Sequence, residues 1–204
     1  MRYTAFFRQT VLLIILAAAL GLGSPADRWQ TLRNRYLGLK SLAGSFTETI
    51  KPAENTGQEP LIFKGSFLFQ LPHNFRLEVQ EPVRQTIVGN DSVVWFYFPD
   101  EQRAVRQQRN QPVPLLAFVE PLLDTSSRIT EEGTGIILIE NDNSFLSPLR
   151  LELDPTGTTV TGLTFTDELG NQCRFLLNRQ RWNPPVSRKN FRFTPPRGVT
   201  VEFQ

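Results

Sequence analysis

Residues 62–80 read IFKGSFLFQLPHNFRLEVQ, and this stretch decides the fold class. Apolar residues, most of them Phe, alternate with polar or smaller ones over residues 63–70. The alternation resumes over residues 75–80, after the turn signal Pro72-His73-Asn74. A repeat of two residues with one polar face indicates antiparallel strands that cover a core on one side.

The same pattern continues along the chain. Residues 86–89 and 92–98 flank Asn90-Asp91, which suits a two-residue turn because both residue types tolerate positive φ. That turn pairs Val88 with Val93, and both faces of the resulting hairpin are apolar. Regularly spaced turn signals favour a curved sheet or barrel in one domain. Further short strands are predicted over residues 45–50, 135–140, 149–154, 160–167, 172–178 and 191–193.

Two amphipathic helices accompany the predicted strands. Apolar residues recur at steps of three and four over residues 27–42, where Asp27 could act as the N-cap and Gly44 ends the pattern. A second helix is predicted over residues 112–123, with Pro121 limiting its end. The pattern leaves two interpretations open: the many aromatic side chains fill an ordinary core, or the sheet and helices enclose an apolar pocket.

The first 26 residues have the order of a secretory signal. Arg2 and Arg8 precede an uncharged run over residues 11–22, and Gly23-Ser24-Pro25-Ala26 offers a cleavage site. The run is shorter than the ~20 residues that cross a bilayer, although an uncleaved anchor is the alternative. We therefore predict a signal peptide over 1–26 and one domain over 27–204, exported to a bacterial periplasm. No Cys near the cut could carry a lipid.

Composition excludes several classes of function. The chain has 22 Lys+Arg and 20 Asp+Glu, and the signal holds two Arg and no acid, so residues 27–204 carry a net charge of zero. A general nucleic-acid binder is disfavoured, because such binding requires clustered positive charge. With one Cys (Cys173) and one His (His73), the chain cannot form an internal disulfide or a His/Cys metal cluster. We find no nucleotide-binding or nucleophile motif, and predict no catalytic residue, metal or cofactor.

Four segments, in order, carry a family resemblance. They are LKSLAGSF (39–46); GSFLF (65–69) with Pro72, FRL (75–77) and Glu81-Pro82; WFY (95–97) with Pro99 and Glu101-Gln102; and FRFTPPRGVTV (191–201). Together they resemble the LolA family, the periplasmic carriers of lipoproteins to the outer membrane. The C-terminal segment is the most specific match.

The resemblance implies a mainly β (α+β) fold: an incomplete antiparallel β-barrel with lid helices over an apolar cavity. It implies a monomeric chaperone without chemistry of its own, acting in outer-membrane biogenesis. Such a carrier accepts acylated lipoproteins from an inner-membrane lipoprotein-releasing ABC transporter, covers their acyl chains, and passes them to an outer-membrane lipoprotein receptor.

Position along the predicted strands and lid helix selects the residues expected to line the lipid-binding cavity. They are Phe67, Phe69, Phe75, Leu77, Ile87, Val94 and Phe96 from the sheet, and Leu116, Val119 and Leu123 from the lid helix. One departure concerns gating. The family's lid latch is an arginine just before the proline of the central hairpin, and this chain has Leu71 there. Arg76 or Lys64 could substitute for it.

Three other functions compete with the carrier. A lipoprotein-anchored receptor of similar fold would need a lipid-bearing Cys near its N-terminus. A lipoprotein-binding or stress-sensing module would usually have a second domain. A periplasmic lipid hydrolase would need a nucleophile and a base, and His73 is the only histidine available to it.

Overall fold

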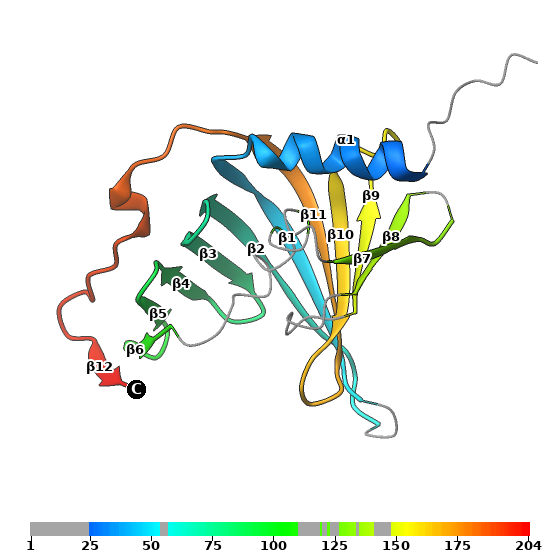
Figure 1. The fold of residues 1–204 in the computed structure, drawn as a ribbon. Coiled ribbons are helices and arrows are strands. Elements are labelled where there is room, and N and C mark those ends of the chain that lie inside the picture. Colours follow the sequence, from blue (N-terminus) through cyan, green and yellow to red (C-terminus); the bar gives the residue numbers. More distant parts are fainter. Residues whose placement is uncertain are drawn as a thin grey trace, which may run out of the picture.

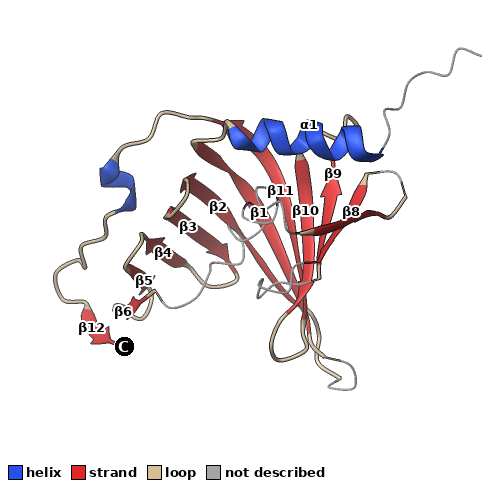
Figure 2. Cartoon of the chain, in the orientation of Figure 1, coloured by secondary structure: helices blue, strands red, loops and turns tan. Residues whose placement is uncertain are grey.

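The computed structural model describes residues 25–53, 57–109, 119, 122, 127–133, 135–140 and 148–204, with side chains from Trp29 onward. One helix and twelve strands make up most of this part of the chain (Figures 1 and 2). In chain order they are α1 (Pro25–Leu37), β1 (Ser41–Lys51), β2 (Leu61–Gln70), β3 (Asn74–Glu81), β4 (Gln85–Gly89), β5 (Val93–Phe98), β6 (Arg103–Gln108), β7 (Arg128–Glu131), β8 (Ile136–Glu140), β9 (Leu149–Leu153), β10 (Val160–Thr166), β11 (Gln172–Trp182), the 3₁₀ helix η1 (Arg188–Phe191) and β12 (Thr200–Phe203).

All twelve strands belong to one sheet with the order β12-β6-β5-β4-β3-β2-β1-β11-β10-β9-β8-β7. Every pairing is antiparallel except that of β12 with β6, which is parallel. The strands curve around a common interior without closing, and α1 lies across one end of them (Figure 1). The predicted mainly β class, with an incomplete antiparallel barrel, is confirmed.

The alternating stretch forms β2 and β3 as predicted. Phe67 pairs with Leu77 and Phe69 with Phe75, so their side chains share one face, and all four are buried. The residues between them, Ser66 with Glu78 and Leu68 with Arg76, share the other face. We call these the inner and the outer face, because the first faces the interior of the curved sheet.

Helix α1 is held to the sheet through its predicted apolar stripe. Leu32 and Tyr36 are fully buried, and the Tyr36 hydroxyl accepts a hydrogen bond of 3.1 Å from the Val160 amide. The Tyr36 and Trp182 rings meet edge to face at 4.9 Å. The prediction that this helix extends to residue 42 is wrong: it ends at Leu37, because residues 41–43 pair with β2 and join the sheet.

The hairpin at Asn90 differs from its predicted register. Gly89 pairs with Val94 and Val88 with Trp95, two residues away from the two-residue turn expected. The Asn90 side chain accepts hydrogen bonds from the amides of Ser92 and Val93, which stabilises a longer turn. A shift of two preserves the face of every side chain, so the predicted faces are correct.

The C-terminal segment was predicted to hold a strand at 191–193, and this prediction is wrong. Phe191 ends η1, and the chain then runs extended over the outer face to β12. The Phe193 ring packs on Trp95 and Tyr97, with ring centres 5.4 and 5.2 Å apart. This segment therefore covers the second apolar face of β5.

The second predicted helix, 112–123, lies outside the described residues except for Val119 and Leu122. Both are helical and buried. No helix in the described part of the chain has the length and apolar character needed to cross a membrane.

Candidate lipid-binding face

The predicted sheet residues form two adjacent rows across the inner face. Phe69, Phe75 and Val94 belong to one row, with Gly89 between the last two. The other row contains Phe67, Leu77, Ile87 and Phe96. Ile87 and Phe96 are partly buried against the core, and the other five side chains are buried. The structure thus brings all seven together on one continuous apolar face.

Val119 is buried in the same cluster as these rows, and its place on a lid helix stays a prediction. Leu116 and Leu123 lie outside the described residues. Contact between any of these side chains and an acyl chain stays a prediction. Sequence reasoning omitted several inner-face residues that belong to the cluster, although the same alternation marks them: Leu42, Phe46, Val79, Leu163, Phe165, Phe175 and Leu177.

Three aromatic rings of the inner face lie over glycines of the neighbouring strand. A Cβ added at Gly89 would overlap the Phe75 ring, and one at Gly44 would come within 2.7 Å of the Phe67 ring. A Cβ at Gly65 would first meet the Glu78 carbonyl oxygen, at 2.3 Å, and then the Phe46 ring, at 2.9 Å. Because only glycine leaves this space, each ring can lie close to the backbone. These closely packed rings on the inner face are called the aromatic floor below.

Glu48 is an acid on this apolar face. Its strand neighbours are Phe63 on β2 and Phe175 on β11, and it forms no hydrogen bond or ion pair with a described residue. Burial raises the pKa of Glu48 to about 7 from 4.5. This carboxyl therefore changes charge near neutral pH, within the face predicted to bind lipid. The sequence carried a signal for it, because Phe46, Glu48 and Ile50 alternate on one face.

The two residues considered for gating make ion pairs with neighbouring acids. Arg76 lies on the outer face, and its Nε donates to Glu78 at 2.6 Å. The ammonium of Lys64 lies 2.8 Å from a carboxylate oxygen of Glu81. A role for either in gating stays a prediction, and these contacts give it no support.

Arg109 holds two turns together beside the inner face. Its Nη1 donates to the backbone carbonyls of His73, at 2.9 Å, and of Asn90, at 3.1 Å. The guanidinium lies 5.6 Å from the centre of the Phe75 ring. This arginine immediately precedes residues 110–118, so it fixes the point where the chain leaves the described sheet.

The residues that a hydrolase would need are not arranged as a catalytic site in the described part of the chain. His73 lies in the exposed turn between β2 and β3, with Nδ1 3.4 Å from Asp91. Cys173 is buried, and burial foremost, with the charges of Asp167 and Glu48, raises the pKa of its thiol to about 11. No group of three potential metal ligands occurs among the described residues.

Comparisons with known proteins agree with this architecture. The family model described as "Outer membrane lipoprotein carrier protein LolA" matches residues 38–194. An outer-membrane lipoprotein carrier protein of Neisseria meningitidis serogroup B is 29% identical over 78% of this chain and 79% of its own length. One from Xanthomonas oryzae pv. oryzae is 30% identical over 80% and 82%.

Among solved structures, an uncharacterized conserved protein from Thermus thermophilus superposes with a TM-score of 0.52. The match covers 89% of this chain and 100% of that one. At 11% identity it shows the likeness of the fold alone.

Proposed function

Because the chain belongs to the LolA family of outer membrane lipoprotein carriers, we propose that it carries acylated lipoproteins from the inner to the outer membrane. The observation that carries this proposal is the continuous inner apolar face, with rings in close approach to Gly44, Gly65 and Gly89. The acyl chains would lie against this floor, beneath α1 and near Val119.

The energetics require such shielding. Removing a 16-carbon chain from water contributes about 12 kcal/mol, at ~0.8 kcal/mol per methylene. An unshielded triacylated protein would therefore stay in its membrane or aggregate. Non-covalent affinities reach a limit near ~20 kcal/mol, so a carrier that must release its cargo should bind more weakly than this limit. Partial coverage of the acyl chains by an open sheet satisfies that condition.

Transfer requires a donor and an acceptor but no covalent step. The proposed donor is an inner-membrane lipoprotein-releasing ABC transporter, and the proposed acceptor is an outer-membrane lipoprotein receptor. Removal of residues 1–26 during export would place the carrier in the periplasm. The curated relatives are named as carrier proteins, and the non-enzymatic role proposed here follows theirs.

Mass spectrometry of the protein purified from periplasm without detergent tests the proposal. We expect co-purifying acylated peptides or lipid, and a preparation that carries neither would contradict the proposal. A second assay asks whether the purified protein keeps a detergent-extracted lipoprotein in solution.

Two matched variants connect that assay to the inner face. Ile87→Glu puts a charge on the inner face, whereas Val93→Glu puts it on the outer face of the same hairpin. Both wild-type side chains are half-buried and β-branched, so a general loss of stability should affect both variants alike. We expect Ile87→Glu alone to lose lipoprotein shielding. Equal loss in two variants that remain folded by circular dichroism would place the cargo elsewhere.

A further inference from the structure

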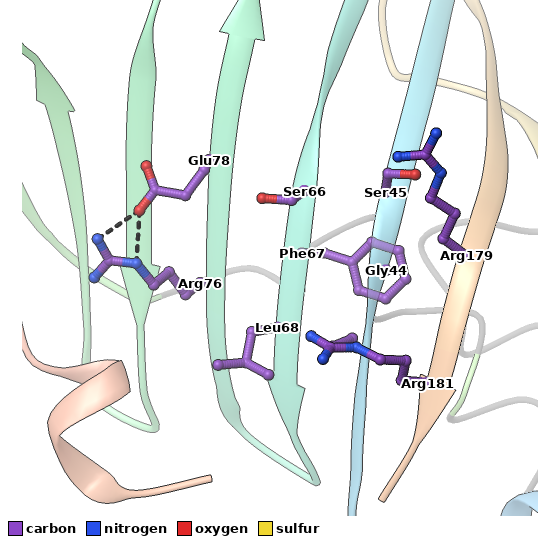
Figure 3. Close-up of a pocket in the computed structure, with 10 residues that line it drawn as sticks. Gly44, Ser45, Ser66, Phe67, Leu68, Arg76, Glu78, Arg179 and Arg181 are labelled. Carbon is purple, nitrogen blue, oxygen red and sulfur yellow. Dashed lines mark hydrogen bonds and ion pairs between the residues drawn. The ribbon is translucent and has the colours of Figure 1, made fainter. Parts of the chain in front are cut away.

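The outer face contains a groove of about 520 Å³ over β1, β2, β3 and β11, opposite the inner rows (Figure 3). Two rows of strand neighbours form it. Arg181, Ala43, Leu68 and Arg76 make up one row, and Ser45, Ser66 and Glu78 make up the other. Small side chains occupy the centre, and charged ones stand at the ends.

A β-bulge brings two arginines to one side of this groove. Ala43 pairs with Arg181, but Ser45 pairs with Asn178, so β11 has an extra residue here. Arg179 takes up the difference with a φ of +51°, a conformation that non-glycine residues adopt rarely. Arg179 and Arg181 consequently both line the groove, from the same strand (Figure 3).

The charge of the groove is positive. Glu78 is neutralised on the opposite side, where it accepts hydrogen bonds from Arg76 and from the Thr86 hydroxyl. Arg179 and Arg181 are exposed and form an ion pair with no described residue. Five of the six other strand arginines, Arg76, Arg103, Arg128, Arg150 and Arg174, each pair with a carboxylate, and the sixth, Arg106 of β6, does not line the groove. Two guanidinium groups therefore remain available to an external anion.

The bottom of the outer groove supplies hydroxyl groups. Ser45 and Ser66 are direct neighbours across β1 and β2, and the Ser66 hydroxyl forms no hydrogen bond with a described residue. Farther along the outer face, the C-terminal segment covers β5, with Phe193 on Trp95 and Tyr97. The groove is a part of the outer face that this segment leaves open.

We propose that this groove binds the phosphate of an anionic phospholipid head group. The guanidinium groups of arginine and the hydroxyls of serine are suited to phosphate oxygens, and Leu68, between Ala43 and Arg76, provides apolar contact for the glycerol. Because the groove opens on the face opposite the inner rows, head-group binding does not compete with an acyl chain held inside. A membrane as the source of the phosphate rests on the proposed function, which brings the chain to two membrane surfaces.

Vesicle flotation tests the assignment with purified protein. The vesicles contain either phosphatidylcholine alone or phosphatidylcholine with one third phosphatidylglycerol, at low salt. We expect binding to the phosphatidylglycerol vesicles only. The double variant Arg179→Gln/Arg181→Gln should weaken it about 30-fold, since each arginine near an anionic surface contributes about fivefold.

The control variant Arg128→Gln/Arg150→Gln removes the same charge from exposed arginines of β7 and β9. It should bind vesicles like the wild type, and an equal loss in both double variants would overturn the proposal. So would binding of glycerol 3-phosphate without vesicle binding, which would indicate a free phosphate ester. Binding of a peptide of alternating Asp and Glu in place of vesicles would also overturn it, in favour of an acidic protein partner.

Lipoprotein shielding is measured in parallel on the same proteins, and we expect the arginine variants to retain it. Wild-type protein that binds vesicles through the groove but shields no lipoprotein would contradict the carrier function alone. Shielding without vesicle binding would contradict the groove proposal alone.

Discussion

The two faces of β1, β2 and β3 are built from alternate residues of the same strands, yet they differ in every physical respect. On the inner face, Phe67 lies over Gly44, dry and closely packed. On the outer face, Ser45 and Ser66 form a polar floor between arginines. A single pleat therefore separates the face proposed to bind acyl chains from the groove proposed to bind an anion.

The two faces should therefore tolerate substitution to different extents. Most side chains of the inner face are buried, and three of its rings lie in space that only a glycine leaves, so small changes there should affect the whole domain. The outer face is exposed over the groove and half-buried under the C-terminal segment, so changes there should remain local. Three sets of stability measurements test this difference between the two faces.

The largest effect should come from the aromatic rings themselves. Phe75→Ala removes a fully buried inner ring and should lower the free energy of unfolding by about 3–5 kcal/mol. Phe193→Ala removes a half-buried ring from the outer face and should cost about 1–2 kcal/mol. Urea denaturation of both variants measures the difference. Similar losses would mean that the two faces are packed equally well.

The next effect concerns Glu48 and depends on pH. Its pKa is about 7 in the folded state against 4.5 when exposed, so the folded protein holds this proton more tightly. Stability contributed by the neutral carboxyl is complete below pH 4.5 and is lost as pH rises through 7. The loss is on the order of 3 kcal/mol.

Glu48→Gln should remove this contribution to the pH dependence and make the protein more stable than the wild type at about pH 8. Denaturation midpoints of the variant and the wild type, measured between pH 4.5 and about pH 8, test the prediction. A variant whose stability follows pH as the wild type does would show that the carboxyl is well solvated.

The smallest effect should come from the glycine beneath Phe75. Gly89→Ala would bring a methyl group into the space of the ring and should cost about 1–3 kcal/mol through displacement of the ring. Gly38→Ala is the control, because its Cβ would meet nothing closer than 3.8 Å. Thermal melts should separate the two variants, and an unchanged melt for Gly89→Ala would refute the close approach.

Much of the sheet could be predicted, because its signal is local. The alternation over residues 63–79 assigns each side chain of β2 and β3 to a face, and a two-residue error in the turn at Asn90 leaves the faces of β4 and β5 intact. Strand β6 was missed because only Ala104 and Val105 are buried among arginines and glutamines. Its place in the sheet depends on pairing with β5 and β12, which no local pattern encodes.

For the candidate sites, too, the local pattern predicted one part and missed the other. The two-residue alternation was enough to predict that Phe67, Phe75 and Phe96 share one face. The groove depends on the bulge at Arg179, which arises because residues 43–45 of β1 pair with a stretch of β11, residues 178–181, that is one residue longer. That mismatch involves residues far apart in the chain, so reading either segment alone does not reveal it.

The rings close to Gly44, Gly65 and Gly89 also bear on which acyl chains the proposed carrier could accept. Aromatic rings offer dispersion contact to a hydrocarbon tail but no directional contact such as a hydrogen bond. A tail bound there should therefore have no fixed register along the rings, so the proposed carrier should accept acyl chains of different lengths.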